Sequence, residues 1–201
     1  MRIITGKFRG RNLVKSDLKT LRPTTDKNRE TLFNILTSGK LIREIGFEIV
    51  EAEILDVCCG TGAISFEALS RGAKFATLID NNRFHLEVAK KNSEHFAVEN
   101  QVAILRADVK KLHENKKFFD LVFVDPPYKE EYPLILKNLV EKNWIQKNSL
   151  VVVEAKTYDM KKFVFENLRL LEIRESGSTA FGFYSLENVA TLPKDGVRTK
   201  L

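Results

Sequence analysis

Short apolar runs alternate with amphipathic segments along most of the chain. Such runs have the length of buried strands, and the segments between them place apolar residues at helical spacing. The apolar runs span residues 54–57, 76–79, 102–105, 121–124 and 150–153, and the amphipathic segments span residues 63–70, 83–96 and 132–143. Phe84, Val88, Ala89 and Phe96 are the expected inner positions of the segment 83–96. Strands that alternate with helices in this way predict a parallel sheet in an α/β fold.

The two ends of the chain follow other patterns. Residues 1–14 alternate loosely around two glycines, which predicts a small β-hairpin or an extended arm. Pro23 to Asp26 is a helix-start signal, and Gly39 marks the expected end of that helix. Residues 168–175 and 180–186 flank a Ser-Gly-Ser-Thr turn, which predicts an antiparallel hairpin. The complete pattern predicts a seven-stranded, mostly parallel, Rossmann-like sheet with an antiparallel C-terminal hairpin.

Length and composition fit one domain with a short extension. The 201 residues are 43% hydrophobic, and no run approaches about eighteen uninterrupted apolar residues, so no membrane span is expected. Cys58 and Cys59 are the only cysteines, so we expect no disulfide and no metal site, and both are expected to pack beneath a turn. Without an apolar signal region at the start, a cytoplasmic protein is expected.

Basic residues are concentrated at the beginning of the chain. Residues 1–30 contain nine Lys and Arg against three acidic residues, and this segment accounts for the whole net charge of +6. The ordinary explanation of such a run is a solvated arm, and the functional explanation is a surface that binds a polyanion. Such a segment is typical of proteins that bind a nucleic acid through its phosphates. The candidate contacts with that polyanion are Arg9, Arg11, Arg22, Thr24 and Arg29.

A glycine turn, residues 56–62, follows the first predicted strand. Its glycines let a ligand approach the backbone, and the next helix supplies free N–H groups. Ser65 replaces the third glycine of a dinucleotide fingerprint, which favours S-adenosylmethionine (SAM) because SAM has no pyrophosphate. Asp80 is placed to accept ribose hydroxyls, and Asp108 is placed to meet an adenine amino group. The predicted cofactor residues are Asp56, Cys58, Gly60, Thr61, Gly62, Asp80, Asn81, Asp108 and Val109.

The sequence Asp125-Pro126-Pro127-Tyr128 follows the fourth apolar run and predicts the catalytic site. A base amine is a poor nucleophile, so an enzyme must hold its lone pair in line with the methyl group. The Asp125 carboxylate and the Pro126 carbonyl are suited to accept hydrogen bonds from the amine and to stabilise its developing positive charge. The two prolines stiffen the backbone, and Tyr128 offers an aromatic face for a base removed from its stack.

These motifs together resemble the bacterial 16S rRNA guanine-N2 methyltransferases of the RsmD type, from Met1 to about Leu186. The resemblance is carried by Met1-Arg-Ile-Ile-Thr-Gly-Lys7, Arg9-Gly-Arg11, Leu21-Arg-Pro-Thr-Thr-Asp26, Arg29-Glu-Thr-Leu-Phe-Asn-Ile-Leu36, Gly60-Thr-Gly62, Glu67-Ala-Leu-Ser-Arg-Gly-Ala73 and Phe119-Asp-Leu-Val-Phe-Val-Asp-Pro-Pro-Tyr128. It implies SAM-dependent methylation of one guanine in 16S rRNA, within the small ribosomal subunit or its assembly intermediate, by an enzyme that we expect to be a monomer. The chain departs from the family pattern at Asp80, where glutamate is expected, and at Phe181, near an expected tyrosine.

Three alternatives remain beside this interpretation. A DNA adenine-N6 methyltransferase uses the same Asp-Pro-Pro-Tyr motif, but it usually carries a separate target-recognition domain that about fifty residues before the glycine turn do not provide. An inactive SAM-fold protein that only binds rRNA during assembly would not need Asp80 and Asp125. An NAD-dependent enzyme would need the missing third glycine. We expect residues 1–40 to form an RNA-binding extension, residues 41–188 a methyltransferase domain and residues 189–201 a flexible tail.

Overall fold

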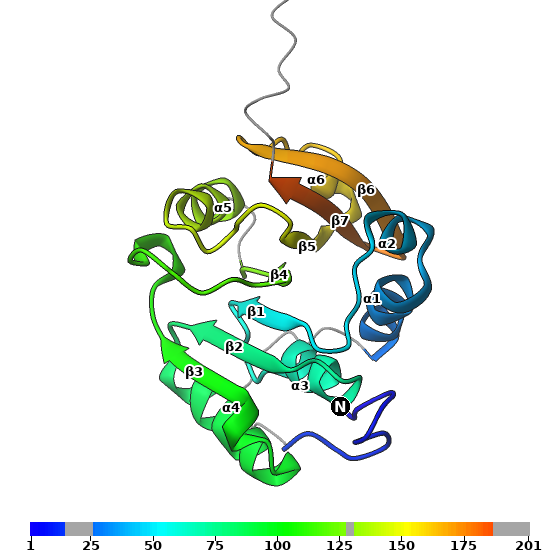
Figure 1. Cartoon of the computed structure of the whole chain (residues 1–201), viewed down its shortest axis with the longest axis vertical. Coiled ribbons are helices and arrows are strands. Elements are labelled where there is room, and N and C mark those ends of the chain that lie inside the picture. The colour runs from blue at the N-terminus through cyan, green and yellow to red at the C-terminus, as the bar shows by residue number, and fades with distance from the viewer. Residues whose placement is uncertain (15–25, 128–130, 187–201) are drawn as a thin grey trace, which may run out of the picture.

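The computed structural model describes residues 1–14, 26–127 and 131–186. Within these ranges, seven strands form one twisted sheet with helices on both faces (Figure 1). The strands are β1 (Glu53–Val57), β2 (Phe75–Asp80), β3 (Val102–Arg106), β4 (Leu121–Val124), β5 (Leu150–Lys156), β6 (Leu168–Ser176) and β7 (Thr179–Leu186). The helices are α1 (Asp26–Ser38), α2 (Lys40–Ile45), α3 (Ala63–Ser70), α4 (Arg83–Phe96), α5 (Tyr132–Glu141) and α6 (Thr157–Met160), with short 3₁₀ helices η1 (Glu99–Gln101) and η2 (Val109–Lys111).

The strand order of the sheet is β3-β2-β1-β4-β5-β7-β6. Strands β1 to β5 pair in parallel, while β7 is antiparallel to both β5 and β6. The predicted Rossmann-like α/β fold with its antiparallel C-terminal hairpin is therefore confirmed. The chain proceeds from β1 outward to β3 and then crosses back to place β4 on the other side of β1. This reversal creates a switch point, and open α/β sheets bind ligands at the carboxyl ends of the strands beside such a point.

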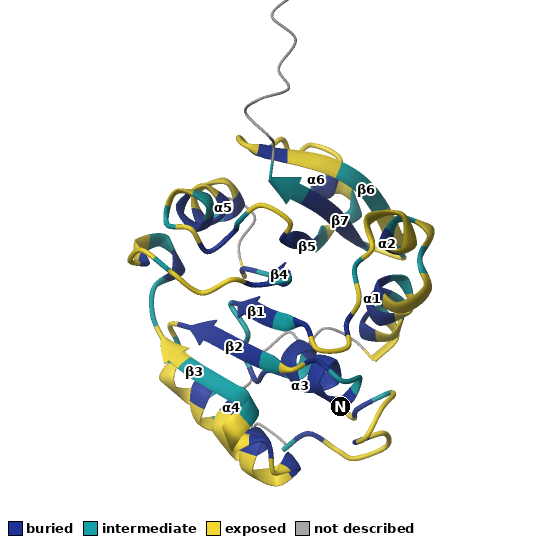
Figure 2. Ribbon diagram, viewed as in Figure 1, coloured by how far each residue is buried: buried dark blue, intermediate teal, exposed yellow. Residues whose placement is uncertain are grey.

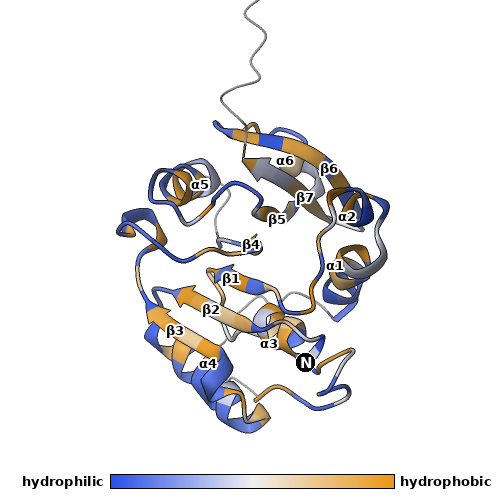
Figure 3. Cartoon of the chain, viewed as in Figure 1, coloured by the Kyte–Doolittle hydropathy of each residue, from blue (hydrophilic) through white to orange (hydrophobic). Residues whose placement is uncertain are grey.

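Both faces of the sheet are covered, so its strands are apolar on both sides. In β1, Ile54 belongs to the core beneath α1, α2, α3 and α4, whereas Leu55 belongs to the core beneath α5 and α6. Val152 and Val153 in β5 divide in the same way. Burial on both faces explains the continuous apolar runs of the sequence. Figure 2 shows the central strands buried and the outer faces of the helices exposed, and Figure 3 shows the corresponding apolar strands.

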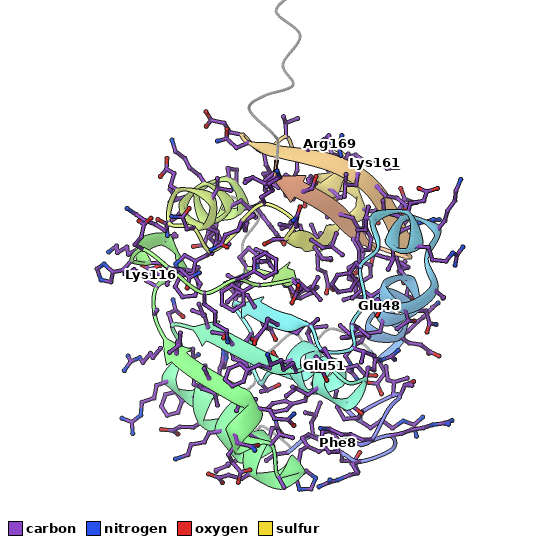
Figure 4. The ribbon with its side chains drawn as sticks, viewed as in Figure 1. Phe8, Glu48, Glu51, Lys116, Lys161 and Arg169 are labelled. Carbon is purple, nitrogen blue, oxygen red and sulfur yellow. The ribbon has the colours of Figure 1, made fainter. Side chains whose placement is uncertain are left out.

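The N-terminal arm, residues 1–14, folds back on itself and packs on α3 and α4. Arg2 and Asn12 form an antiparallel bridge, as in the predicted small hairpin. The Phe8 ring stacks on the Phe96 ring at the end of α4, with 4.9 Å between the ring centroids. Figure 4 labels Phe8 on the arm. The buried apolar side chains of the arm, Ile3, Phe8 and Leu13, share a core with α3 and β1. The arm is therefore packed against the sheet domain as a part of its hydrophobic core.

Some local details differ from the sequence patterns. Phe84 is 61% exposed instead of buried, because the buried face of α4 carries Leu86, Ala89 and Phe96, and Phe84 points away from that face. α5 ends at Glu141 rather than at Asn143, whose φ of 56° is left-handed. α2 and α6 have six and four residues, too few to leave a helical period in the sequence. The helix-start signal before Asp26 and the predicted tail lie outside the described residues.

We searched the described helices for one that could span a membrane. No helix there combines the length and the apolar character that a span requires.

Candidate active site

Four predicted acidic residues converge where neighbouring parallel strands end. Asp56 is the fourth residue of β1, Asp80 is the last residue of β2, Asp108 lies two residues beyond β3, and Asp125 directly follows β4. The strands β3, β2, β1 and β4 are adjacent in that order. All four acids therefore lie along one edge of the sheet, on both sides of the switch point.

The thiol of Cys58 indicates how close several of these carboxylates lie to the end of β1. Burial raises the pKa of this thiol, and the negative charges of Asp80, Asp125, Glu131 and Asp56 raise it further. A thiol with a raised pKa stays protonated and is a poor nucleophile. The geometry thus gathers carboxylates from three strands around Cys58, and it supports a packing role for Cys58 rather than a catalytic one.

The glycine turn is held in a left-handed backbone conformation. The φ angles are 61° at Cys58, 54° at Gly60 and 80° at Gly62, and the Gly62 N–H donates to the Cys59 carbonyl at 2.9 Å. A Cβ atom at Gly62 would lie 2.6 Å from Cδ2 of Leu78 on β2. Backbone conformation and lack of space therefore both require glycine at this position. The turn brings its backbone to the edge where the acids lie.

Asp56 supports the start of α3 from beneath the turn. Its buried Oδ2 accepts hydrogen bonds from the Ser65 hydroxyl at 2.7 Å and from the Ser65 N–H at 3.3 Å. Burial raises the pKa of Asp56 to about 6, and the charge of Asp80 adds to the rise, while the bonds from Ser65 oppose it. Asp56 thus fixes the first turn of α3, where helix N–H groups face the edge of the sheet.

Asp80 is oriented through both of its carboxylate oxygens. Oδ2 accepts the Gly60 N–H at 2.9 Å, and Oδ1 accepts the Asn82 N–H at 2.8 Å. His85, in the first turn of α4, places Nδ1 3.3 Å from Asp80 Oδ2. These contacts fix the acid that is predicted to meet a ribose and tie it to the glycine turn. The sequence analysis did not single out His85. The signal that could have identified it is its position in the first helical turn after Asp80, an acidic residue at the end of a strand.

The end of β3 is joined to the helix that follows the catalytic motif. Asp108 Oδ1 accepts the Lys110 N–H at 3.0 Å and so caps η2. Lys110 Nζ lies 2.9 Å from Glu131 Oε1, and Asn138 Nδ2 on α5 donates to the Val109 carbonyl at 2.9 Å. The predicted residues Asp108 and Val109 are therefore positioned relative to α5, which begins directly after Glu131.

The predicted catalytic motif begins where β4 ends. The Asp125 N–H donates to the Val57 carbonyl at 3.4 Å, which ties the motif to the end of β1. Pro126 is buried and Pro127 is exposed, and the two proline rings restrict the backbone there. Tyr128 lies outside the described residues. The start of the motif is thus held next to the end of β1, which leads into the glycine turn.

Two other predicted cofactor residues differ in their exposure. Thr61 is buried, and its carbonyl accepts a hydrogen bond from Asn92 Nδ2 at 3.0 Å. Asn81 is exposed, and its carbonyl accepts a hydrogen bond from Arg106 Nε at 3.4 Å. Like His85, Asn92 is a functional candidate that the sequence analysis missed. The pattern that could have identified it is a polar residue on the inner face of an amphipathic helix.

Comparisons with known proteins identify the family of this chain. Residues 1–185 match the family described as conserved hypothetical protein 95. The ribosomal RNA small subunit methyltransferase D of Haemophilus influenzae is 36% identical, over 92% of this chain and 93% of its own length. The chain belongs to the small subunit methyltransferase D family. The family resemblance seen in the sequence is therefore confirmed.

Solved structures place this family member among the methyltransferase folds. A putative methyltransferase from Escherichia coli matches with a TM-score of 0.76 and 30% identity, covering 93% of this chain and 98% of that chain. The magnesium protoporphyrin IX methyltransferase of Synechocystis, with bound SAM, matches with a TM-score of 0.57 and 15% identity over 80% of each chain, which shows the fold alone. The predicted methyltransferase fold is confirmed.

The predicted RNA contacts of this family member differ in their surroundings. Arg9 is exposed at the tip of the arm. Arg11 is also exposed, and its guanidinium lies over the Phe96 ring at 4.9 Å from the centroid. Arg22 and Thr24 lie outside the described residues. The RNA contacts of Arg9 and Arg11 stay predictions.

The structure corrects the expectation that Arg29 contacts RNA. Its side chain is 0% exposed, and its guanidinium donates to Asp26 at 3.0 Å and to the Arg2 carbonyl. Its Nε lies 3.7 Å from the buried carboxylate of Glu67. A buried, paired arginine cannot reach a phosphate without leaving its partner carboxylate in the interior. Arg29 instead connects α1 to the arm and to α3.

Proposed function

We propose that the chain methylates the exocyclic N2 amine of one guanine in the 16S rRNA of the small ribosomal subunit, with SAM as the methyl donor. The observation that carries the proposal is the position of Asp125 and Pro126. They follow β4 next to the end of β1, beside the glycine turn and the strand-end acid Asp80. A donor site over β1 to β3 and an acceptor site at β4 would then share the crevice at the switch point.

The residues at the edge fit the functional groups of SAM. When bound, SAM supplies an electrophilic methyl group on its sulfonium. The backbone of Gly60–Gly62 and the first turn of α3 offer polar groups to the methionine end, because the left-handed turn brings this backbone to the edge. Asp80 accepts the ribose hydroxyls, since a carboxylate can accept about four hydrogen bonds. Asp108 and Val109 border the adenine.

Asp125 and Pro126 prepare the guanine amine for attack. The carboxylate and the carbonyl accept the two amine hydrogens, which orients the nitrogen lone pair and stabilises the positive charge that develops on nitrogen. A nitrogen–carbon bond forms as the carbon–sulfur bond breaks, so that S-adenosylhomocysteine leaves. The nitrogen then loses one proton to Asp125 or to solvent. Tyr128 stacks on the flipped base.

The RNA partner is recognised by charge. Residues 1–40, which include the arm and α1, form the RNA-binding extension, and residues 41–188 form the methyltransferase domain. Arg9 and Arg11 contact phosphates, because both are exposed in the segment that carries the net positive charge. The substrate is the small subunit or its assembly intermediate, on which the enzyme acts as a monomer in the cytoplasm.

The test is methyl transfer to defined substrates. Small subunits purified from cells that lack this protein are incubated with tritiated SAM and the enzyme, and the modified base is mapped. We expect one labelled guanine, with the methyl group on N2. Label on an adenine of duplex DNA supplied in the same reaction would instead establish the DNA methyltransferase alternative.

Variants test the role of the motif. Asp125→Ala should lower the transfer rate by about 100-fold or more, because an acceptor for the developing charge is lost, while SAM affinity measured by calorimetry stays unchanged. Glu141→Ala, which removes an exposed carboxylate at the end of α5, is the matched control and should keep full activity. An Asp125→Ala enzyme with wild-type activity would contradict the assigned role.

A further inference from the structure

Asn92 is a buried amide that joins two distant segments of the chain. Its side chain lies near the middle of α4 and is 0% exposed. Oδ1 accepts the Val14 N–H at 2.7 Å, at the end of the described part of the arm. Nδ2 donates to the Thr61 carbonyl at 3.0 Å, between Gly60 and Gly62 of the glycine turn. One side chain therefore contacts both the RNA-binding extension and the cofactor turn.

The chemistry of the two partners fixes the orientation of this amide. Val14 presents an N–H group and Thr61 presents a carbonyl, so only one of the two amide orientations satisfies both. The opposite orientation would place two acceptors together and two donors together in the interior, where each unsatisfied group costs about 1–3 kcal/mol. Asn92 thus holds its two partners at a fixed separation.

The Thr61 carbonyl depends on Asn92 because the helix does not use it. The Ser65 N–H, four residues later, donates to Asp56, and α3 starts its own bonding with the Phe66 N–H on the Gly62 carbonyl. Asn92 therefore supplies the donor at the centre of a turn that lies between two left-handed glycines.

We propose that Asn92 is a positioning residue that couples the cofactor turn to the arm, so that a ligand at the turn stabilises the docked end of the arm. The inference rests on the proposed function, because it assumes that the glycine turn binds SAM and that the N-terminal arm binds RNA. By thermodynamic reciprocity, an arm held by RNA then favours cofactor binding by the same factor. Asn92 itself touches neither the methyl group nor the base.

The first experiment uses the wild-type protein and needs no RNA. Hydrogen exchange of the Val14 amide is followed by NMR with and without saturating S-adenosylhomocysteine. We expect the ligand to slow this exchange about fivefold, the lower end of typical coupling between sites. The Asn115 amide, which donates to the Lys142 carbonyl away from the arm and the turn, is the internal control and should not respond.

The second experiment separates the two bonds of Asn92. Asn92→Asp keeps an oxygen for the Val14 N–H but replaces the donor that faces the Thr61 carbonyl. We expect the Kd for S-adenosylhomocysteine to rise about tenfold and the response of Val14 to disappear, because one buried bond is lost. Ser93→Ala is the matched control, since the buried Ser93 hydroxyl, within the described part of the chain, bonds inside its own helix to the Lys90 carbonyl at 2.7 Å. Its Kd should stay within about twofold of wild type.

The outcomes separate this inference from the proposed function. If S-adenosylhomocysteine binds the wild-type protein and Val14 exchange does not change, the coupling is refuted while the methyltransferase proposal stands. An unchanged Kd in a folded Asn92→Asp variant also refutes it. If the wild-type protein does not bind S-adenosylhomocysteine, both proposals fail. Should Asn92→Asp not fold, the wild-type exchange measurement still decides.

Discussion

Glu67 holds the N-terminal arm onto the domain, and its neutralisation gives a sharp test of that role. Its fully buried carboxylate accepts the Ile4 N–H at 2.8 Å and the Thr5 N–H at 3.1 Å. Arg71 places Nη2 2.8 Å from the same carboxylate, and Arg29 places Nε 3.7 Å from it. The side chains of Arg29 and Arg71 are 0% and 7% exposed. The network therefore has little contact with solvent.

Glu67→Gln keeps the shape of the side chain and removes its charge. Two buried guanidinium groups then lose a counter-charge, and the new NH₂ group faces N–H donors. Removing one partner of a buried ion pair costs about 3–5 kcal/mol. Burial leaves little solvent screening to reduce this cost, although Arg29 keeps a bond to Asp26, which is half-exposed. We expect the free energy of unfolding to fall by about 3–5 kcal/mol.

Urea denaturation at pH 7 measures the loss, and hydrogen exchange at the Ile4 and Thr5 amides locates it in the arm. Glu87→Gln is the control, because its pair with Arg83 is exposed and should contribute less than about 0.5 kcal/mol. A loss below about 1 kcal/mol for Glu67→Gln, with unchanged protection of Ile4 and Thr5, would refute the assigned role of this carboxylate.

Other substitutions test RNA binding by the arm, the buried carboxylate of Asp56 and the backbone of the glycine turn. Replacing Arg9 and Arg11 by alanine should weaken RNA binding while SAM affinity stays unchanged. The magnitude of the slope of log affinity against log salt should fall by about 1.4, which is about 0.7 for each lost phosphate contact. If the double variant and the wild type methylate RNA at equal rates, the arm does not bind the RNA. Because the pKa of Asp56 is raised to about 6 from its ordinary 3.8, the folded state binds this proton more tightly, and the contribution of Asp56 to wild-type stability falls by about 3 kcal/mol as pH rises through this window. Asp56→Asn should gain that amount relative to wild type between pH 4 and pH 8 in urea titrations, and a constant difference would contradict the raised pKa. Gly62→Ala should lose about 2 kcal/mol in thermal unfolding, since φ is 80° and the new Cβ meets Leu78; an unchanged Tm would show that the turn relaxes freely.

The sheet and its acidic edge were predictable because their signals are local. Burial on both faces makes each parallel strand a continuous apolar run, and the residues directly after such a run necessarily lie at one edge of the sheet. Asp80 and Asp125 could therefore be placed from the sequence alone. The glycine turn was predictable for a similar reason, since a left-handed backbone at Gly62 selects one residue type.

The remaining features depend on partners far along the chain. Arg29 lies in a basic segment, and only the fold brings Glu67 beside it and buries both. His85 and Asn92 gain their roles from contacts with other elements, which helical periodicity cannot encode. Phe84 is apolar, but it lies two residues before the buried Leu86 and therefore on the other side of α4. An apolar residue of a helix is buried only when it lies on the face that packs against the sheet.

The two adjacent thiols at the glycine turn are half-buried, and we expect them to react slowly with alkylating reagents while the protein is folded. Burial is the main cause that raises the pKa of both Cys58 and Cys59, and only the thiolate reacts with iodoacetamide or maleimide at a useful rate. Unfolding restores two ordinary thiols, so the labelling rate at a fixed reagent concentration reports how often this part of the molecule opens. Because these are the only two cysteines in the sequence, the wild-type chain can be followed in this way without an engineered probe.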